Sequence, residues 1–237
     1  MIGFERKQKI IKYLEIKHSA SIKDLAEFLY TSEASVRRDI SALECDGLVK
    51  KVYGGVVLAS HANDIIPVSL RDSENAAAKE AVAKAASELV HDDSTILLDA
   101  SSTVRRILKH IQNRKNLKIF TNNLSILNEF SNDSAKIYCT GGAFNQKNND
   151  FVGPMAEAFV RSVSADIMFF SSQGISADGE ISDVSEEETS IRKAMLSRAK
   201  YKVFLCDSGK IGITRPFTVC TKDDIDKIIC DTKLPWE

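Results

Sequence analysis

The sequence predicts two domains of different architecture: a small helical domain that ends in a hairpin, and a larger α/β domain with a mostly parallel sheet. The first prediction rests on three short amphipathic helices within residues 4–46, followed by two short strands. The second rests on apolar runs that alternate with helical segments from residue 76 onward. Between them the chain is polar, contains one proline and lacks periodicity, which is typical of a linker. We therefore expect domains at 1–58 and 76–237, with a linker at 59–75.

Three helices open the small domain. The first spans residues 4–16, where apolar residues recur at helical spacing on one face. The second begins at Ser21, because an acidic residue three places later gives the spacing of a capping box. The third is capped by Ser32 and stops at an Asp-Gly pair. The runs 48–53 and 56–58 are typical of two strands around a Gly-Gly turn, so the pattern predicts a winged helix–turn–helix.

The third helix carries a narrow basic face. Val36, Ile40 and Leu43 share its apolar side, whereas Arg38 points the opposite way and Arg37 lies at the flank. Helix–turn–helix proteins present the first turns of such a helix to base edges in the major groove of DNA. The residues predicted to contact bases or phosphates come from this helix and the wing: Ser35, Arg37, Arg38, Ser41, Lys50, Lys51 and Tyr53.

Residues spread through the small domain carry a family resemblance: Arg6, Ile10, Leu14, Leu25-Ala26, Phe28, the run from Ser32 to Ile40, Leu43-Glu44, Gly47-Leu48 and Gly54-Gly55. In type and spacing they are similar to the DeoR family of bacterial transcriptional regulators. Ser35 stands where the family usually has Thr, which keeps the hydroxyl and loses a methyl group that could touch thymine. The resemblance implies operator double-stranded DNA as a partner and a role as a transcriptional repressor.

Composition limits the other possibilities. With 43% hydrophobic and 27% charged residues over 237 positions, the chain has the makeup of an ordinary soluble protein with room for two domains. The longest apolar runs fall short of the roughly 20 residues needed to span a bilayer, and the N-terminus resembles a charged helix more than a signal peptide. We therefore expect a cytoplasmic protein with no membrane partner. The five cysteines form no Cys-x-x-Cys pair, so neither a zinc site nor a disulfide framework is indicated. We expect no metal and no cofactor.

In the α/β domain the strands and helices alternate, which implies a mostly parallel sheet flanked by helices. Strands are expected at 95–98, 117–120, 136–139, 166–170, 202–206 and 227–230. Helices are expected at 76–89, 102–111, 124–130, 154–161 and 186–199. Ligands of such sheets collect at the carboxyl ends of the strands, where loops lead into helix N-termini.

Four strand ends carry suitable polar residues, although each alone could be no more than a cap or a turn. Ser101, Ser102 and Thr103 precede a helix, so their hydroxyl and N–H groups could converge on a phosphate, with Lys210 as the cation. The other strand ends offer groups that could bind sugar hydroxyls. The predicted effector-binding residues are Asp99, Ser101, Ser102, Thr103, Thr121, Asn122, Gly142 and Lys210.

The same half resembles the C-terminal sensor domain of the DeoR family, through matches that include Arg71, Lys79, Asp99, Gly141-Gly142, Glu188, Arg192-Lys193 and the run Asp207 to Lys210. The resemblance implies a ribose-5-phosphate isomerase-like fold that binds phosphorylated sugars. Two residues depart from the family pattern. Ser101 replaces a glycine and either crowds the phosphate or adds a donor. Gly209 replaces a serine and loosens the loop before Lys210.

Three functions compete. The first is a repressor of a carbohydrate-use operon, controlled by a phosphorylated sugar and free of catalysis. The second is a phosphosugar isomerase with a DNA-binding head, for which Asp178, Glu180 and Asp183 are the available bases. The third is a regulator whose C-terminal domain only oligomerises. We favour the first, acting as a symmetric homo-oligomer, a dimer or tetramer, on repeated half-sites.

Overall fold

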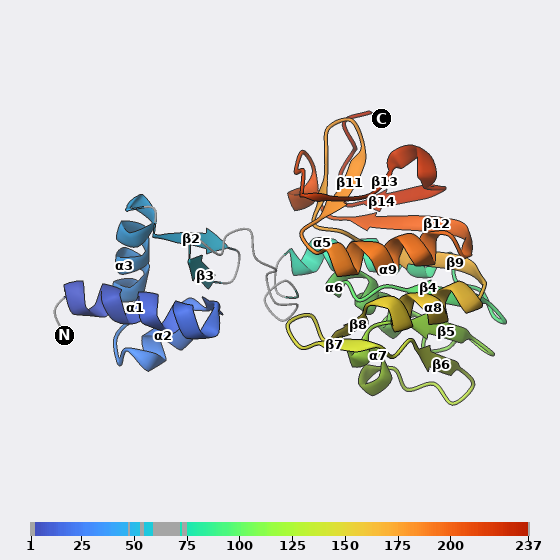
Figure 1. The fold of residues 1–237 in the computed structure, drawn as a ribbon, viewed down its shortest axis with the longest axis horizontal. Helices are drawn as coiled ribbons and strands as arrows, with labels where there is room; N and C mark the ends of the chain where they lie inside the picture. The colour runs from blue at the N-terminus through green and yellow to red at the C-terminus, as the bar shows by residue number, and fades with distance from the viewer. Residues whose placement is uncertain (1–2, 47, 53–54, 59–71, 73–74, 237) are drawn as a thin grey trace. The chain divides into compact units, whose positions relative to one another are not determined.

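The polypeptide divides into two units, Met1–Glu74 and Asn75–Glu237, each with its own core. The computed structural model describes residues 3–46, 48–52, 55–58, 72 and 75–236 (Figure 1). The predicted linker at 59–75 falls outside the described residues except for Asp72 and Asn75, and it stays a prediction. Tyr53, predicted to contact DNA, also lies outside them.

The first unit has the helices that the sequence predicts, α1 (Gly3–Lys17), α2 (Ile22–Phe28) and α3 (Glu33–Cys45). Their apolar faces meet in one core, in which Leu14, Leu25 and Ile40 are fully buried. The capping box at the start of α2 is present, since the Asp24 N–H donates to Ser21 Oγ at 3.0 Å and the Ser21 N–H donates to the Asp24 carboxylate at 3.3 Å.

The wing contains one strand more than the sequence predicts. Strands β2 (Val49–Val52) and β3 (Gly55–Leu58) pair antiparallel, and the two-residue strand β1 (Ser19–Ala20) pairs with the other edge of β3. Gly55, which the sequence assigned to a turn, is the first residue of β3. A Cβ atom there would stand 2.2 Å from the carbonyl oxygen of Ala20, so this close approach requires glycine.

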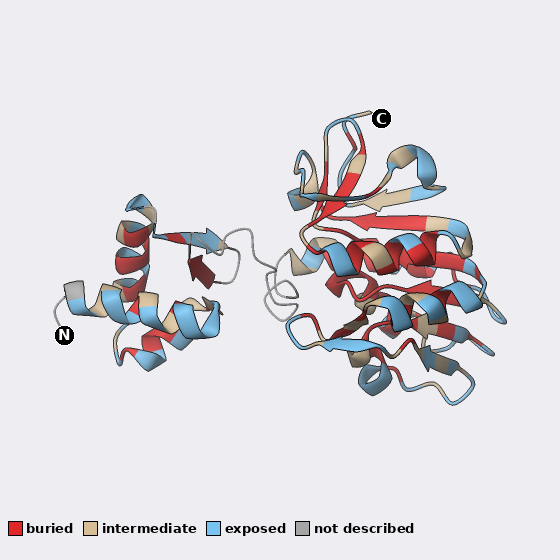
Figure 2. Ribbon diagram, viewed as in Figure 1, coloured by how far each residue is buried: buried red, intermediate tan, exposed pale blue. Residues whose placement is uncertain are grey.

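The second unit is an α/β domain with a parallel sheet, as predicted. Every pairing in its six-stranded sheet is parallel, and the strand order is β14-β12-β9-β4-β5-β6. The strands are β4 (Thr95–Leu98), β5 (Lys118–Thr121), β6 (Lys136–Cys139), β9 (Ala165–Phe170), β12 (Ala199–Cys206) and β14 (Lys227–Cys230). The central strands are almost entirely buried (Figure 2), because helices cover both faces.

The two faces have separate cores. One joins α5 (Ala76–Ser87), the 3₁₀ helix η2 (Arg106–His110) and α7 (Leu124–Glu129) to the sheet. The other joins α8 (Pro154–Ser162) and α9 (Glu186–Leu196) to it. In Figure 1 these helices pack against the strands of the sheet. Loops follow the carboxyl ends of the strands and line that edge of the sheet.

The structure differs from the sequence prediction in its short elements. The helix expected at 102–111 is one α-helical turn, α6 (Ser102–Arg105), followed by η2. The last expected helix ends at Leu196, because β12 already begins at residue 199. Five short strands were not predicted: β7 (Ala143–Asn145), β8 (Asp150–Val152), β10 (Gly174–Ile175), β11 (Glu180–Asp183) and β13 (Phe217–Thr221). These segments lack the apolar runs, bounded by polar residues, that indicated the four-residue strands of the main sheet.

Within the part of the chain that the structure describes, no helix combines the length and apolar character needed to cross a membrane. The same residues include no cluster of three or more His, Cys, Asp or Glu side chains arranged to hold a metal ion.

Candidate DNA-contacting face and effector site

The predicted DNA-contacting arginines lie on the exposed face of α3. Arg37 donates to Glu33 Oε2 at 3.3 Å, one helical turn away, and Arg38 donates to Ser35 Oγ at the same distance. The Arg37 side chain is 65% exposed, and ion pairs in such surroundings add little stability. Both guanidinium groups are therefore held loosely, by neighbours on their own helix, and can exchange these partners for groups on DNA.

The wing is fastened to α3 by Lys51. Its Nζ lies 2.8 Å from Glu44 Oε2 and donates to Ser41 Oγ at 2.9 Å, while its backbone N–H donates to Glu44 Oε1 at 3.0 Å. The hydrogen bonds from Lys51 lower the pKa of Glu44 below its ordinary value. Ser41 and Lys51 thus contact each other, and both help to fix the wing beside α3. Lys50 is exposed on the same strand.

The buried side of α3 is anchored by a contact whose role the sequence did not reveal. Arg6 on α1 forms a two-pronged ion pair with Asp39, and its Nη2 lies 3.1 Å from Asp39 Oδ1. Asp39 is 6% exposed, so this contact is largely shielded from solvent. Bidentate Arg–carboxylate pairs fix geometry as well as adding energy. The pair therefore holds α3 against α1. Both residues belong to the family resemblance, but their 33-residue separation gave no local signal.

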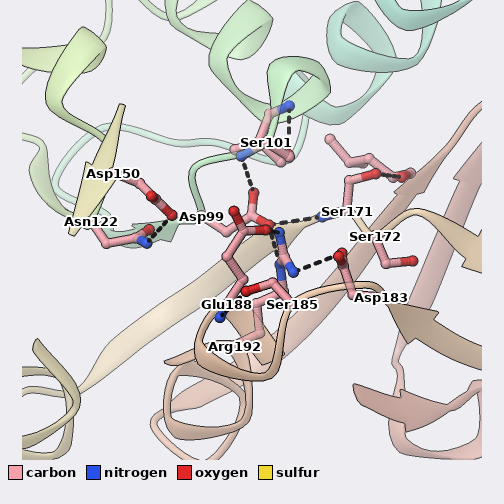
Figure 3. Close-up of polar contacts among 12 residues, drawn as sticks. Asp99, Ser101, Asn122, Asp150, Ser171, Ser172, Asp183, Ser185, Glu188 and Arg192 are labelled. Atoms are coloured by element: carbon pink, nitrogen blue, oxygen red, sulfur yellow. Dashed lines mark hydrogen bonds and ion pairs between the residues drawn. The ribbon is translucent and has the colours of Figure 1, made fainter. Parts of the chain in front are cut away.

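In the second unit, Asp99 follows β4 and orders the loop after it (Figure 3). Asp99 Oδ1 accepts the Ser101 N–H at 3.0 Å, and Oδ2 accepts the Ser171 N–H at 3.3 Å and Arg192 Nε at 2.8 Å. Asp99 is 1% exposed. The predicted ligand for a sugar hydroxyl thus has both carboxylate oxygens engaged, and it acts here as an anchor for the loop.

Arg192 on α9 sits at the centre of a buried charge cluster. Besides Asp99, its guanidinium contacts Asp183 Oδ2 at 2.8 Å and Glu188 Oε2 at 3.1 Å. Asn148 donates to the second oxygen of Glu188. Burial alone would lower the pKa of Arg192, but attraction to the three carboxylates raises it above its ordinary value. We call Asp99, Asp183, Glu188 and Arg192 the arginine cluster. Sequence reasoning missed it, although the Glu188–Arg192 spacing of four fits one helix face.

The predicted phosphate loop has its hydroxyls in different environments. Ser101 Oγ accepts the Val104 N–H at 3.3 Å and so caps α6, and its φ of −72° needs no glycine. The departure from the family pattern therefore supplies a helix cap. Ser102 and Thr103 are buried, and Thr103 Oγ1 has no hydrogen-bond partner within the described part of the chain. A buried hydroxyl without a partner is energetically costly, so this group is suited to a ligand.

Lys210 ends the short 3₁₀ helix η3 (Ser208–Lys210), which follows β12. Its Nζ donates to Ser171 Oγ at 2.6 Å, and Asp207 Oδ2 lies 3.6 Å from it. The N–H of the same Ser171 donates to Asp99, so Lys210 and Asp99 are both hydrogen-bonded to Ser171. Ser171 thus links the predicted cation to Asp99, the first residue of the loop after β4.

The other predicted residues lie on the side of β5 and β8. Thr121 Oγ1 accepts the Asn123 N–H at 3.0 Å, and Asn122 Nδ2 donates to the Phe151 carbonyl oxygen at 3.1 Å. Figure 3 shows Asn122 beside Asp150, to one side of the arginine cluster. The buried Oδ1 of Asn122 has no hydrogen-bond partner among the described residues.

Gly142 has a structural reason to be glycine. Its φ is +111°, and a Cβ atom would come within 2.8 Å of the Val152 carbonyl oxygen on β8. Packing against the unpredicted β7–β8 hairpin explains this residue without any ligand.

Comparison with known proteins agrees with this geometry. Residues 6–62 match the model of the DeoR-like helix-turn-helix domain, and residues 74–232 match that of the DeoR C terminal sensor domain. The chain belongs to the DeoR family of transcriptional regulators.

Relatives match along nearly the whole chain. The HTH-type transcriptional regulator GolR of Listeria innocua is 31% identical over 99% of this chain and 92% of its own length. The transcriptional repressor AccR of Agrobacterium fabrum is 29% identical over 96% of this chain and 89% of its own. Ribose 5-phosphate isomerase A of Methanocaldococcus jannaschii superposes with a TM-score of 0.42 at 17% identity, over 58% of this chain and 55% of that one. Nothing about function follows from a likeness of that size.

Proposed function

We propose that this chain represses an operon for carbohydrate use, and that a phosphorylated sugar bound in its second unit controls its affinity for operator DNA. The observation that carries the proposal is the link that Ser171 makes between Lys210 and Asp99, the residue that opens the loop after β4. The same chain also bears a winged helix–turn–helix. In this function the binding of the sugar changes the affinity for DNA, and no covalent step takes part.

The DNA-binding part rests on α3 and the wing. Arg38 and Arg37 are the base-reading candidates because they are exposed and only loosely partnered, and Arg–guanine contacts are the commonest specific contact in the major groove. Ser35 and Lys50 extend the same face. Ser41 and Lys51 hold the wing in register with the helix and also border the groove beside it. Tyr53 remains a candidate from the sequence.

The effector part rests on polar groups that follow three strands of the parallel sheet, β4, β5 and β12. The phosphate is held by backbone N–H groups at the start of α6, by the hydroxyl of Thr103 and by the ammonium group of Lys210. Lys210 now contacts a neutral hydroxyl, and its carboxylate neighbour is 3.6 Å away, so a phosphate would be a stronger partner. Asn122 offers an unused amide oxygen to a sugar hydroxyl. The arginine cluster keeps this frame rigid.

The signal to the head can start at Asn75, the first residue of the second unit. Asn75 Nδ2 donates to Asp207 Oδ1 at 2.7 Å, and the other oxygen of Asp207 faces Lys210. A Cβ atom at Gly209 would lie 2.7 Å from Asn75 Nδ2. Gly209 therefore permits a close contact with Asn75, whereas the sequence suggested only that this glycine loosens the loop. A phosphate that draws Lys210 away from Asp207 would change the contact that holds Asn75, where the chain enters the unit.

The test is titration calorimetry with phosphorylated sugars and their unphosphorylated parents. Lys210→Ala should weaken the binding of a phosphorylated sugar by about 1.5–3 kcal/mol, the range for a hydrogen bond to a charged group, and change that of the parent little. Lys200→Ala is the matched control, because Lys200 is exposed and pairs with Asp166 elsewhere in the unit. Equal losses for both compounds would remove Lys210 from the phosphate site. Failure of every phosphorylated sugar to bind the wild type would favour the oligomerisation-only function.

The proposal includes a symmetric homo-oligomer, a dimer or a tetramer. One winged head offers too few contacts for high selectivity, and two heads can occupy half-sites spaced by whole helical turns of DNA. Sedimentation should show at least a dimer, and a monomer both on and off DNA would contradict this.

A further inference from the structure

Tyr30 is a bulky residue in a backbone conformation that side chains disfavour. It lies in the turn between α2 and α3, and its φ is +48°, in the left-handed region. Hydrogen bonds from the Tyr30 N–H to the Glu27 carbonyl oxygen and from the Thr31 N–H to the Ala26 carbonyl oxygen shape this turn. The turn itself thus imposes the conformation, and glycine or asparagine would adopt it at lower cost.

Among the described residues of its unit, the side chain of Tyr30 is almost without packing contacts. It is 96% exposed, whereas Phe28 close by is 45% exposed and packs its ring on Tyr13 at 4.6 Å. Strained backbone at exposed positions is concentrated at functional sites, where a contact with another molecule compensates the cost. A fully exposed aromatic ring on a strained turn therefore indicates a contact outside the chain.

The position of the ring favours DNA as that partner. Tyr30 lies two residues before Ser32, the cap of the recognition helix. It lines a hollow together with Lys23, Thr31 and Glu33. Lys23 and Glu33 also line the neighbouring groove, where Arg37, Ser41 and Lys51 lie. The two hollows therefore share a border, and Tyr30 extends the DNA-contacting face of α3 beyond its N-terminus.

We propose that Tyr30 contacts the DNA backbone, with its hydroxyl donating to a phosphate oxygen at the edge of the half-site and Lys23 beside it. The proposal rests on operator binding by the head. Tyrosine hydroxyls are among the usual donors to phosphates, and contacts of this kind set the register of a protein on the duplex without reading bases. The ring also covers sugar atoms next to that phosphate, which a smaller residue cannot do.

The test uses the full-length chain and two duplexes of equal length, one selected by the wild type from a random-sequence library and one unrelated. Tyr30→Gly should lose about tenfold in affinity for both duplexes, because a phosphate contact carries no sequence information. Tyr30→Phe should lose most of the same factor. The thermal stability of Tyr30→Gly should not fall, because glycine accepts the turn.

Salt dependence separates this contact from a charged one. Because tyrosine is neutral, Tyr30→Gly should lower the affinity without changing the slope of log K against log salt concentration. Lys23→Ala should reduce the magnitude of that slope by about 0.9. Tyr201→Phe, an exposed tyrosine in the other unit, is the matched control and should bind as the wild type does.

Three results would overturn the proposal: wild-type affinity of Tyr30→Gly for both duplexes, a loss confined to the selected duplex, or a loss accompanied by a change in sedimentation, which would make Tyr30 a protein–protein contact. Failure of the wild type to select any duplex would instead contradict operator binding itself, so the two failures are distinguishable.

Discussion

The two units use charged side chains in opposite ways. In the head, Arg37 and Arg38 are exposed, and their hydrogen bonds within the described residues are to neighbours on their own helix. In the second unit, Arg192 is 3% exposed and bound by three carboxylates, one of which, Asp99, is 93 residues away in the sequence. Exposed cations are available to a partner and matter little for folding, whereas a buried one is essential for folding and unavailable to a partner. The comparison teaches that arginine in this chain has two separable roles, which substitution can test.

The largest effect is expected from Arg192→Met. This change leaves Asp99, Asp183 and Glu188 buried without their cation, which should cost about 3–5 kcal/mol of the free energy of unfolding of the second unit. Denaturant titration followed by circular dichroism measures it. Arg161→Met is the matched control, since Arg161 is exposed and pairs with Glu157 one turn away. A variant at residue 192 as stable as this control would show that the cluster is not structural.

Arg38→Ala should have the converse effect, leaving stability within about 0.5 kcal/mol of the wild type and damaging DNA recognition. Loss of a bidentate contact to guanine should reduce discrimination between the selected duplex and its single-base variants by about 1–3 kcal/mol. Lys50→Ala should instead weaken all sequences alike. Unchanged footprinting by a folded Arg38→Ala protein would refute the assignment of α3 as the recognition helix.

A smaller effect is expected from Asn75→Gly. Glycine tolerates the φ of +48° at this position, so the substitution removes the hydrogen bond to Asp207 without straining the backbone. We expect effector binding to persist while the response of DNA affinity to the effector shrinks by about 1 kcal/mol, the size of one hydrogen bond. Asn116→Gly is a close control, because Asn116 has a φ of +56° and also donates to an aspartate. Equal responses in both variants would exclude Asn75 from the relay.

The sequence could predict the features that depend on neighbouring residues, but not the contacts between residues far apart in the chain. The caps at Ser21 and Ser32 and the basic face of α3 depend on residues within one or two helical turns, so a local pattern reveals them. The loop after β4 was predictable because parallel strands place their carboxyl ends together. Asp99 and Arg192 are 93 residues apart, and no local pattern couples them.

Short elements were missed for a related reason. The β7–β8 hairpin has three residues in each strand, and its presence explains Gly142, which the sequence suggested as a ligand-binding residue. Gly55 similarly owes its identity to Ala20, 35 residues earlier. Glycines required by a distant carbonyl group cannot be told from glycines required by a turn until the strands are paired.

The central claim is that a phosphate bound at Lys210 controls DNA binding by the head. The most direct measurement is the Kd for the selected duplex with and without a saturating phosphorylated sugar, in the wild type and in Lys210→Ala. We predict a change of about 5- to 150-fold in the wild type, the usual range of allosteric coupling. At the same effector concentration Lys210→Ala should respond far less, although its affinity for DNA alone is unchanged. An unaltered wild-type Kd in the presence of a sugar phosphate that demonstrably binds, or an undiminished response in Lys210→Ala, would contradict the account.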